Sequence, residues 1–307
     1  MSQIWSADKV VSEQGAAKII ERQFPQLKPV KAVVLGKGFD NLVFLVNNKF
    51  VFRFPRREFA AELIQTENKL LPVLSSLLPI PIPYPIYQGV LEGENPWTYG
   101  GYKSLPGETP KRLSEEQRMK SAIPLARFLR VLHNFPLNET KELQVPFDQI
   151  GRIDLNKRRP MFKKLLEEAF EKNLIQKDMY QLLQEFLTSV KSLSTDQRQT
   201  LVHGDLHIRN MLVDEEGKVS AVIDWGDTHI GHPAIDLSIV YSFLPPEGRK
   251  IFFDVYGDVQ IEEKKAANFK AIYTTLLLLL YSNEQNDHTL KEDCLDSLHI
   301  ALKEVSF

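Results

Sequence analysis

Residues 201–236 concentrate the side chains of this chain that could carry out chemistry. Among them, Asp205 lies five positions before Asn210, and Asp224 follows fourteen positions after Asn210. A carboxylate can orient an attacking hydroxyl and accept its proton, while an amide and a second carboxylate can hold magnesium against nucleotide phosphates. The spacing therefore suits phosphoryl transfer.

Two short apolar runs, Met211–Val213 and Val219–Ile223, separate these polar positions and are broken by a Glu-Glu-Gly sequence at 215–217. Apolar, β-branched runs on either side of a turn predict a hairpin. Asn210 would come directly before the first strand and Asp224 directly after the second. A rigid hairpin would thus present both side chains at strand ends, where functional groups are often found.

The same stretch resembles a known family. The motifs His203-Gly204-Asp205-Leu206-xxx-Asn210 and Ile223-Asp224-Trp225-Gly226-Asp227 are similar to those of the aminoglycoside and macrolide phosphotransferases, which are small-molecule relatives of the protein kinases. The resemblance implies that Asp205 is the catalytic base, that Asn210 and Asp224 bind Mg²⁺, and that His203 and Asp236 brace the catalytic loop. Each motif alone is also typical of ordinary turns, so it is their order and spacing that favour the kinase interpretation.

Residues 31–55 predict the start of an antiparallel sheet, with two strands within 31–46 joined by a glycine turn and a third strand over 49–55. Gly36 and Gly38 have no side chains, so backbone amides of this turn can approach phosphates closely. Together with Asn41, they are candidate nucleotide-binding residues. A lone Gly-x-Gly is equally typical of a simple β-turn.

A cation and a glutamate complete the expected nucleotide site. Arg53 stands where most of the family has lysine, but its strand, Phe50-Val-Phe-Arg-Phe-Pro55, resembles that of aminoglycoside 2''-phosphotransferases and macrolide phosphotransferases that also have arginine. A helix expected over 57–77 carries Glu62 and Glu67, and the family pattern favours Glu67 as the partner of Arg53. The alternative is that Glu67 lies on a solvated helix face.

The prolines within 78–85 end this helix and extend the chain toward a strand expected over 96–103. Residues 103–107 would connect two lobes. By resemblance, backbone groups of this segment bind the nucleotide base, and Tyr102 borders the base pocket. The expected co-substrate is ATP or GTP, with Mg²⁺ as the cofactor, and the choice of nucleotide stays open.

Helices are expected over most of the remaining chain, namely over 8–23, from the Ser114-xx-Gln117 capping box to His133, twice within 158–194, over 233–243 and about three times within 246–304. The predicted fold class is α+β, a protein-kinase-like two-lobed fold. Residues 1–102 would form a nucleotide-binding N-lobe with a five-stranded antiparallel sheet. Residues 103–307 would form a mainly helical C-lobe that carries the catalytic loop and the acceptor-binding site.

The composition sets limits on partners and location. The chain has 307 residues, of which 43% are hydrophobic and 25% charged, as is typical of globular proteins. A net charge of −2 without a basic stripe argues against nucleic-acid binding. The lone Cys294 fits a reducing compartment, the N-terminus lacks a signal-peptide core, and the apolar run Thr275–Tyr281 is too short to span a bilayer. A cytoplasmic monomer without a membrane partner is expected.

The acceptor is the least determined feature. Residues 230–307 hold 12 Asp or Glu against 7 Lys or Arg, and an acidic cleft would attract a polycationic aminoglycoside, although a solvated helix surface gives the same count. The leucines at 276–280 could line a pocket for an apolar macrolide or pack in the core. A metabolite alcohol such as choline, homoserine, a sugar or a ketosamine is the alternative acceptor. A catalytically silent nucleotide-binding regulator is a further alternative, against which the intact Asp205, Asn210 and Asp224 argue.

Overall fold

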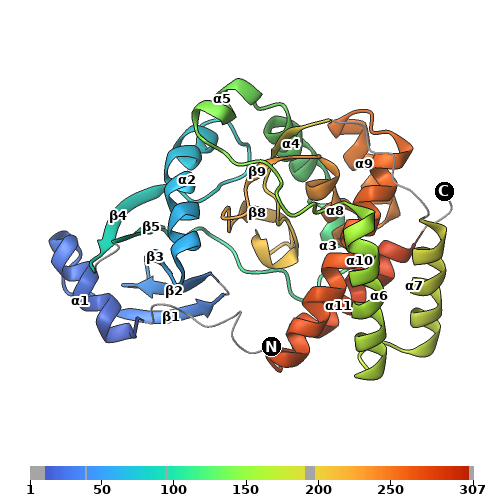
Figure 1. The fold of residues 1–307 in the computed structure, drawn as a ribbon, viewed down its shortest axis with the longest axis horizontal. Coiled ribbons are helices and arrows are strands. Elements are labelled where there is room, and N and C mark those ends of the chain that lie inside the picture. The colour runs from blue at the N-terminus through green and yellow to red at the C-terminus, as the bar shows by residue number, and fades with distance from the viewer. Residues whose placement is uncertain (1–10, 39, 94–95, 191–197, 304–307) are drawn as a thin grey trace. The chain divides into compact units, whose positions relative to one another are not determined.

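The computed structural model describes residues 11–38, 40–93, 96–190 and 198–303. The chain forms two structural units, Met1–Leu105 and Pro106–Phe307 (Figure 1). Within the described residues, no helix is long and apolar enough to cross a membrane.

The first unit is built on a five-stranded antiparallel sheet in the order β1-β2-β3-β5-β4. Its strands are β1 Ala32–Lys37, β2 Asn41–Val46, β3 Phe50–Pro55, β4 Pro85–Leu91 and β5 Trp97–Lys103. Asn47 and Asn48 both adopt positive φ angles of 53° between β2 and β3, as a two-residue hairpin turn requires. The predicted five-stranded antiparallel sheet is confirmed.

One face of this sheet is aromatic and is covered by helix α1, Glu13–Gln23, followed by the short 3₁₀ helix η1, Pro25–Leu27. Side chains alternate between the two faces of a strand, so Phe52 and Phe54 share this face, and Phe54 stacks on Tyr99 with ring centroids 4.4 Å apart. Helix α1 begins later than the predicted 8–23, because the Ser12 hydroxyl accepts a hydrogen bond from the Gly15 backbone and caps it; residues 8–10 lie outside the described residues.

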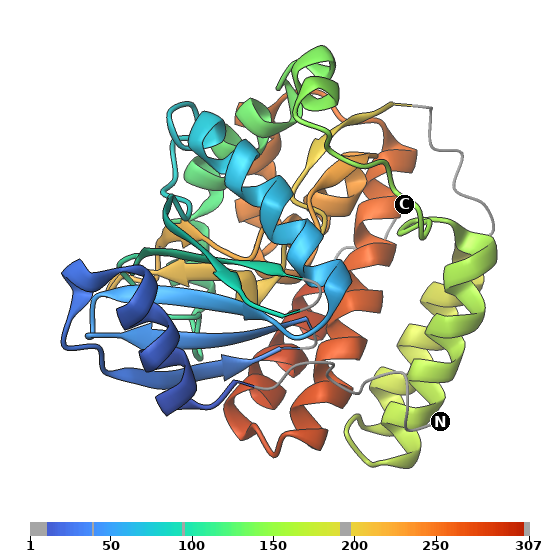
Figure 2. The same cartoon turned by 60° about the vertical axis from the view of Figure 1, so that its left-hand side comes forward.

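Helix α2, Glu58–Ser75, packs against β3, β4 and β5. Figure 2 shows α1 and α2 on opposite sides of the sheet. Residues at alternate positions of β3 therefore face different helices. Phe52 and Phe54 face α1, and the residue between them faces α2.

The second unit contains two small two-stranded sheets among its helices. Strands β6, Thr200–Val202, and β9, His229–Gly231, pair antiparallel. Strands β7, Met211–Val213, and β8, Val219–Val222, form the predicted hairpin, with Gly217 at φ 80° in its turn. These strands begin and end the loops that carry the candidate catalytic residues.

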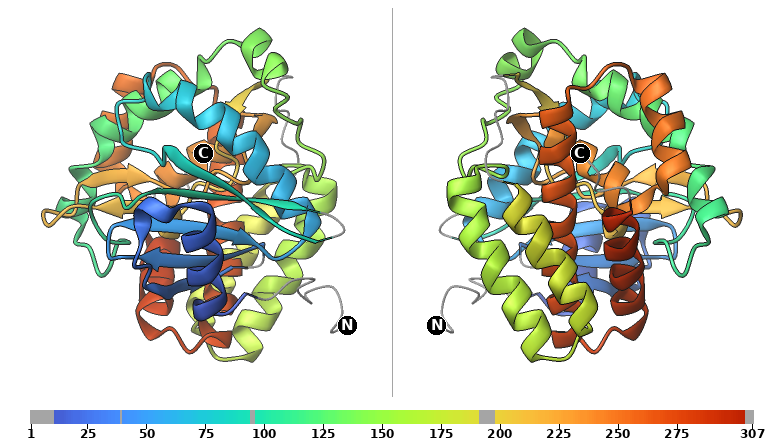
Figure 3. Two further views of the ribbon diagram at one scale, coloured as in Figure 1. Left: turned by 90° about the vertical axis from the view of Figure 1, so that its left-hand side faces the viewer. Right: turned by 90° about the vertical axis from the view of Figure 1, so that its right-hand side faces the viewer.

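Helices make up the rest of the second unit. They are α3 Glu115–Met119, α4 Ala122–His133, α5 Leu137–Glu142, α6 Leu155–Glu171, α7 Lys177–Ser189, the 3₁₀ helix η2 Ile208–Asn210, α8 Ala234–Phe243, α9 Pro246–Tyr256, α10 Ile261–Glu284 and α11 His288–Leu302. Every residue of α8 is buried, because α10 and α11 both pack against it. Figure 3 shows α10 and α11 beside the pair α6 and α7.

The prediction of a single helix from Ser114 to His133 is wrong. The Ser114–Gln117 capping box is present, but the helix that it caps, α3, ends at Met119. Pro124 has no N–H group to donate to the carbonyl of Lys120, so a continuous helix would lose that hydrogen bond. The chain turns at Ser121 and starts α4 anew, with Pro124 in its first turn, where proline is tolerated.

Candidate active site

Arg53 and Glu67 form a buried ion pair in the first unit. Arg53 lies between Phe52 and Phe54 on β3, so its side chain points to the opposite face of the sheet, against α2. Its Nη1 atom is 2.6 Å from Oε2 of Glu67, and the two side chains are only 8% and 9% exposed. Glu62, the other candidate on this helix, is exposed. The structure therefore brings together the cation and the glutamate that the family pattern favours.

The other candidate nucleotide-binding residues lie on the same sheet. Gly36 stands at an irregularity in the pairing of β1 with β2, and a Cβ atom built on it would meet nothing within 4 Å. The Gly38 amide donates to the carbonyl of the buried Asn41 over 2.9 Å. Tyr102 is half-buried on β5 and pairs with Val51 of β3. Their roles in nucleotide binding stay predictions.

The catalytic loop, residues 203–210, runs from β6 to β7 and is held by Asp236 of α8. One carboxylate oxygen of Asp236 accepts the His203 amide at 2.7 Å, and the other accepts the Gly204 amide at 2.9 Å. His133 Nε2 lies 3.2 Å from the same carboxylate, while its Nδ1 lies 2.7 Å from the Tyr256 hydroxyl. Burial alone would raise the pKa of Asp236, but these donors, chiefly His133, hold the pKa below its usual range.

Gly204 joins this loop tightly to the loop that follows β8. Its φ angle is 88°, and a Cβ atom at this position would lie 2.1 Å from the Asp227 carbonyl oxygen, so only glycine fits. The Asp205 amide donates to His203 Nδ1 at 3.4 Å, which leaves Nε2–H of His203 to donate to the Ile223 carbonyl at 3.0 Å. The loops of residues 203–210 and 223–228 are thus bonded to each other.

Asp205 is held by the side chains of Asn210 and His207. Nδ2 of Asn210 donates to the Asp205 carbonyl at 2.9 Å and to its carboxylate at 3.3 Å. His207 Nδ1 accepts the Arg209 amide at 3.2 Å, which leaves Nε2–H to face the Asp205 carboxylate at 3.3 Å. Burial opposes ionisation of Asp205, but His207 outweighs it, with Lys270 adding to the effect, and the pKa lies well below its usual range. Asp205 is therefore an ionised, oriented carboxylate.

Asp224 is tied to Asn210 through the backbone. The Ile223 amide donates to the Asn210 carbonyl at 2.9 Å, so Asp224 directly follows a residue bonded to Asn210. Asp224 itself is exposed and has a φ angle of 63°, a left-handed conformation that aspartate tolerates better than most residues. The structure thus brings the loops of Asp205, Asn210 and Asp224 together in the second unit.

The oxygen atoms at this position suit magnesium. Because Asn210 contacts Asp205 through Nδ2, its side-chain oxygen could serve as a ligand, and the exposed carboxylate of Asp224 could supply another. Magnesium prefers oxygen ligands and is usually held by one or two protein groups together with substrate phosphates. No group of three or more His, Cys, Asp or Glu side chains that could hold a metal occurs in the described part of the chain.

One charged residue near Asp205, Lys270, is absent from the site predicted from the sequence. Lys270 of α10 is 9% exposed and donates to the Thr274 hydroxyl at 2.8 Å. Burial lowers the pKa of Lys270, and Asp205 opposes that effect. A single lysine inside the apolar stretch Phe269–Tyr273 was the available signal for a buried cation. The sequence around Lys270 does not indicate that this residue lies near Asp205.

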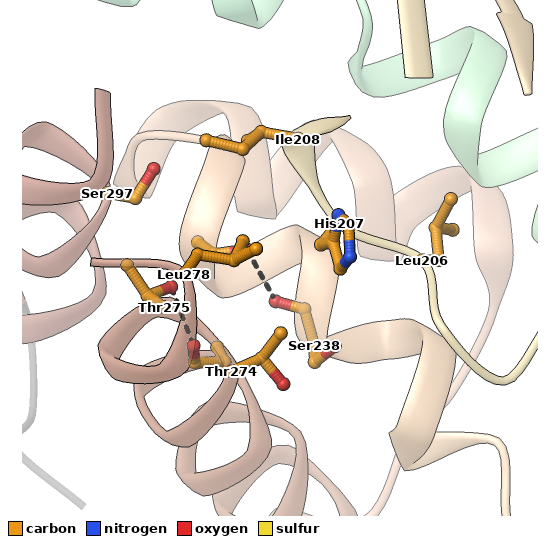
Figure 4. Close-up of a pocket in the computed structure, with 10 residues that line it drawn as sticks. Leu206, His207, Ile208, Ser238, Thr274, Thr275, Leu278 and Ser297 are labelled. Carbon is orange, nitrogen blue, oxygen red and sulfur yellow. Dashed lines mark hydrogen bonds between the residues drawn. The ribbon is translucent and has the colours of Figure 1, made fainter. Parts of the chain in front are cut away.

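A small pocket lies directly behind the catalytic loop. Figure 4 shows His207 and Leu206 of the loop on one side and side chains of α8, α10 and α11 on the others. Its lining is rich in hydroxyl groups and contains no carboxylate: Leu206, His207, Ile208, Ser238, Ser242, Ala271, Thr274, Thr275, Leu278 and Ser297.

The acidic lining expected from the composition of residues 230–307 is not found in this pocket. Carboxylates of residues 230–307 form hydrogen bonds elsewhere. Asp236 braces the catalytic loop, Glu263 accepts the Gln260 amide at the start of α10, and Asp293 accepts the Arg112 amide. Of the leucines at 276–280, three are buried in the core and Leu278 reaches the pocket. The run thus serves mainly in packing.

Comparison with known proteins shows the family and the fold of the chain. The model of the phosphotransferase enzyme family matches residues 31–269. The complex of the aminoglycoside phosphotransferase APH(2'')-IIIa with GDP and kanamycin has a similar structure, with a TM-score of 0.64 at 22% identity over 93% of this chain and 97% of the other. The ADP-bound aminoglycoside phosphotransferase APH(2'')-Ib gives a TM-score of 0.57 at 23% identity, over 93% and 98% of the two chains. A macrolide 2'-phosphotransferase from Brachybacterium faecium gives 0.56 at 17% identity, over 93% and 97%.

The fold is therefore that of the kinase-like antibiotic phosphotransferases, with an antiparallel sheet in the first unit and a mainly helical second unit. Because the family model covers most of the sequence, the chain belongs to the phosphotransferase enzyme family. The expected family and the expected class of enzyme, a phosphotransferase, are confirmed.

Proposed function

We propose that the protein is a small-molecule kinase that transfers the γ-phosphoryl group of a nucleoside triphosphate to a hydroxyl of its acceptor. The main support is the bonded set of Asp205, Asn210 and the loop that begins with Asp224, found in a chain of the phosphotransferase family. Positioning and electrostatic stabilisation supply most of the rate in such reactions, and a rigid, hydrogen-bonded loop provides both.

In this proposal each candidate residue has a separate task. Asp205 orients the acceptor hydroxyl and accepts its proton as the hydroxyl oxygen bonds to the γ-phosphorus and the bond to the leaving diphosphate breaks. Asn210 and Asp224 hold Mg²⁺, which when bound neutralises charge on the phosphates. Because Asp205 is ionised far below neutral pH, it is ready to accept a hydrogen bond from the hydroxyl at any physiological pH.

The first unit would bind the nucleotide. Arg53, held by Glu67, would contact the phosphates, and its planar guanidinium can donate two parallel hydrogen bonds. The turn with Gly36, Gly38 and Asn41 would supply backbone donors, and Tyr102 would border the base. Complexes of GDP and ADP with similar structures support either a guanine or an adenine nucleotide as the co-substrate.

The acceptor in this proposal is a small alcohol, with two candidate classes. An aminoglycoside or macrolide antibiotic is supported by the substrates named for the similar structures. A metabolite alcohol is supported by the pocket behind the catalytic loop, which has no carboxylate for a polycation, and by the buried Lys270.

The decisive experiment measures nucleotide turnover by the purified protein. ATP and GTP are each supplied with and without Mg²⁺, first alone and then with a panel of aminoglycosides, macrolides and metabolite alcohols, and phosphorylated product is identified by mass spectrometry. The proposal expects Mg²⁺-dependent transfer that Asp205→Ala slows by roughly 10²–10⁴-fold. Tight nucleotide binding with neither hydrolysis nor transfer would instead identify a silent regulator.

A further inference from the structure

Lys270 is a buried cation without a carboxylate partner. Its side chain is 9% exposed, and within the described part of the chain its Nζ atom donates one hydrogen bond, to the Thr274 hydroxyl at 2.8 Å. An ammonium group has three donors, and a buried charge is costly unless it is paired. Within the described ranges Lys270 forms no salt bridge at 4 Å or less, although the Asp205 and Asp227 carboxylates lie near enough to oppose the effect of burial on its pKa.

Arg158 of α6 adds a second positive charge to the same region. Its Nε and Nη2 atoms donate to the backbone carbonyls of Gly151 and Ile150, each at 2.9 Å. Its guanidinium lies 5.7 Å from the ring of Tyr273, and Lys270 Nζ lies 6.0 Å from the same ring. Within the described ranges, these contacts orient Arg158 without neutralising its charge.

The neighbouring Arg152, unlike Lys270 and Arg158, is paired with carboxylates. Its guanidinium is 3.0 Å from the Asp148 carboxylate and also contacts the Asp227 carboxylate. Asp148 and Asp227 are therefore already engaged by a fixed arginine. Lys270 of α10 and Arg158 of α6, by contrast, have no carboxylate at ion-pair distance among the described residues.

This positive charge lies close to the proposed reacting hydroxyl. Thr274, the partner of Lys270, lines the same pocket as His207 (Figure 4), and His207 Nε2 is 3.3 Å from the Asp205 carboxylate. The charge of Lys270 also acts on the pKa of Asp205, in addition to the larger effects of burial and His207. A polycation bound here would bring like charges together in a poorly solvated region, which is unfavourable.

We propose that the acceptor alcohol carries an anionic group, a carboxylate or a phosphate. Lys270 binds this group while Asp205 orients the hydroxyl and accepts its proton. The inference rests on the proposed kinase function and narrows its acceptor to hydroxy acids or phosphorylated alcohols. Lys270 supplies a charge-assisted hydrogen bond, and Arg158 contributes to the field that attracts the anion.

The test compares acceptors that differ only in charge. Glycerate and glycerol 3-phosphate are assayed beside their neutral counterparts, glyceramide and glycerol, and beside the polycation kanamycin, with ADP or GDP release as the readout. The variants are Lys270→Met, which removes the charge and keeps the length of the side chain, and Lys270→Arg, which keeps the charge. Lys291→Met on α11 is the matched control.

We expect the wild-type kcat/KM to favour an anionic acceptor over its neutral counterpart. Loss of one hydrogen bond between charged groups should reduce that preference about 10- to 100-fold in Lys270→Met, mainly through KM. Lys270→Arg and Lys291→Met should keep the preference. Equal or better turnover of neutral or cationic acceptors would overturn the inference, and so would an equal loss for all acceptors in Lys270→Met.

Calorimetry of the same anions separates this inference from the kinase proposal. Binding of an anionic acceptor to the wild type but not to Lys270→Met supports the anion site even if no transfer is seen, in which case only the kinase proposal fails. Transfer to alcohols together with no binding of any anion leaves the kinase proposal intact and overturns the anion site.

Discussion

Replacing Asp236 with asparagine should both destabilise the protein and slow its chemistry. The fully buried carboxylate accepts hydrogen bonds from the amides of His203 and Gly204 and lies 3.2 Å from His133 Nε2. An asparagine keeps only one acceptor oxygen, so at least one of these donors would face an NH₂ group. Breaking a buried charged network costs about 3–5 kcal/mol, and we expect a loss of that size in the free energy of unfolding.

Thermal unfolding provides the assay. For a protein of this size, each kcal/mol shifts Tm by roughly 2–4 °C, so Asp236→Asn should lower Tm by about 6–20 °C. Asp254→Asn on α9, where the side chain is exposed, should change Tm by no more than about 2 °C. A Tm within about 2 °C of wild type, together with unchanged kcat, would refute the role of Asp236 as the brace of the catalytic loop.

The pH dependence gives an independent check of the same residue. The pKa of Asp236 is lower in the folded protein than the value of about 3.9 expected for an unfolded chain. A carboxylate with a lowered folded pKa stabilises the protein above its unfolded pKa, and this contribution is lost as the pH falls through the folded pKa. The Tm difference between wild type and Asp236→Asn should therefore be constant near neutral pH and narrow only below about pH 4.

Three further variants test the proposed site. Asp205→Ala should reduce turnover by roughly 10²–10⁴-fold while nucleotide affinity stays near wild type, and transfer at the wild-type rate would exclude Asp205 as the base. Asp224→Ala should weaken binding of the magnesium–nucleotide complex, measured by calorimetry with and without Mg²⁺, and unchanged affinity would count against its metal role. Arg53→Met should destabilise the first unit by about 3–5 kcal/mol because it removes a cation paired with the buried Glu67. The double variant with Glu67→Met should recover part of that loss in urea unfolding, and strictly additive effects would contradict the coupling.

Local sequence predicted the elements whose causes are local. The sheet of the first unit follows from alternating apolar residues and from the Asn47-Asn48 turn, and the 211–222 hairpin from two β-branched runs around Gly217. The contact between Asp205 and Asn210 also arises within a single loop. These parts of the fold and of the site could be predicted because neighbouring residues determine them.

The parts that sequence reasoning missed depend on distant segments. His133 and Asp236 are 103 positions apart, and the region near Asp205 that contains Lys270 is assembled by packing of α10 against α8. The hydrophobic periodicity of the sequence does not indicate which distant residues contact each other. The acidic count of residues 230–307 does not identify the acceptor for the same reason, since composition does not say which way a carboxylate such as Glu263 or Asp293 points.

The close approach of Gly204 to the Asp227 carbonyl limits how this enzyme can move. Since the space left at Gly204 admits no side chain, and since bonds join His203 and Asn210 to Ile223, the two loops cannot slide past each other. Asp205, Asn210 and Asp224 would therefore keep their spacing while other segments of the chain move. Variants in those other segments would change the rates of substrate entry and product release and leave the chemical step intact.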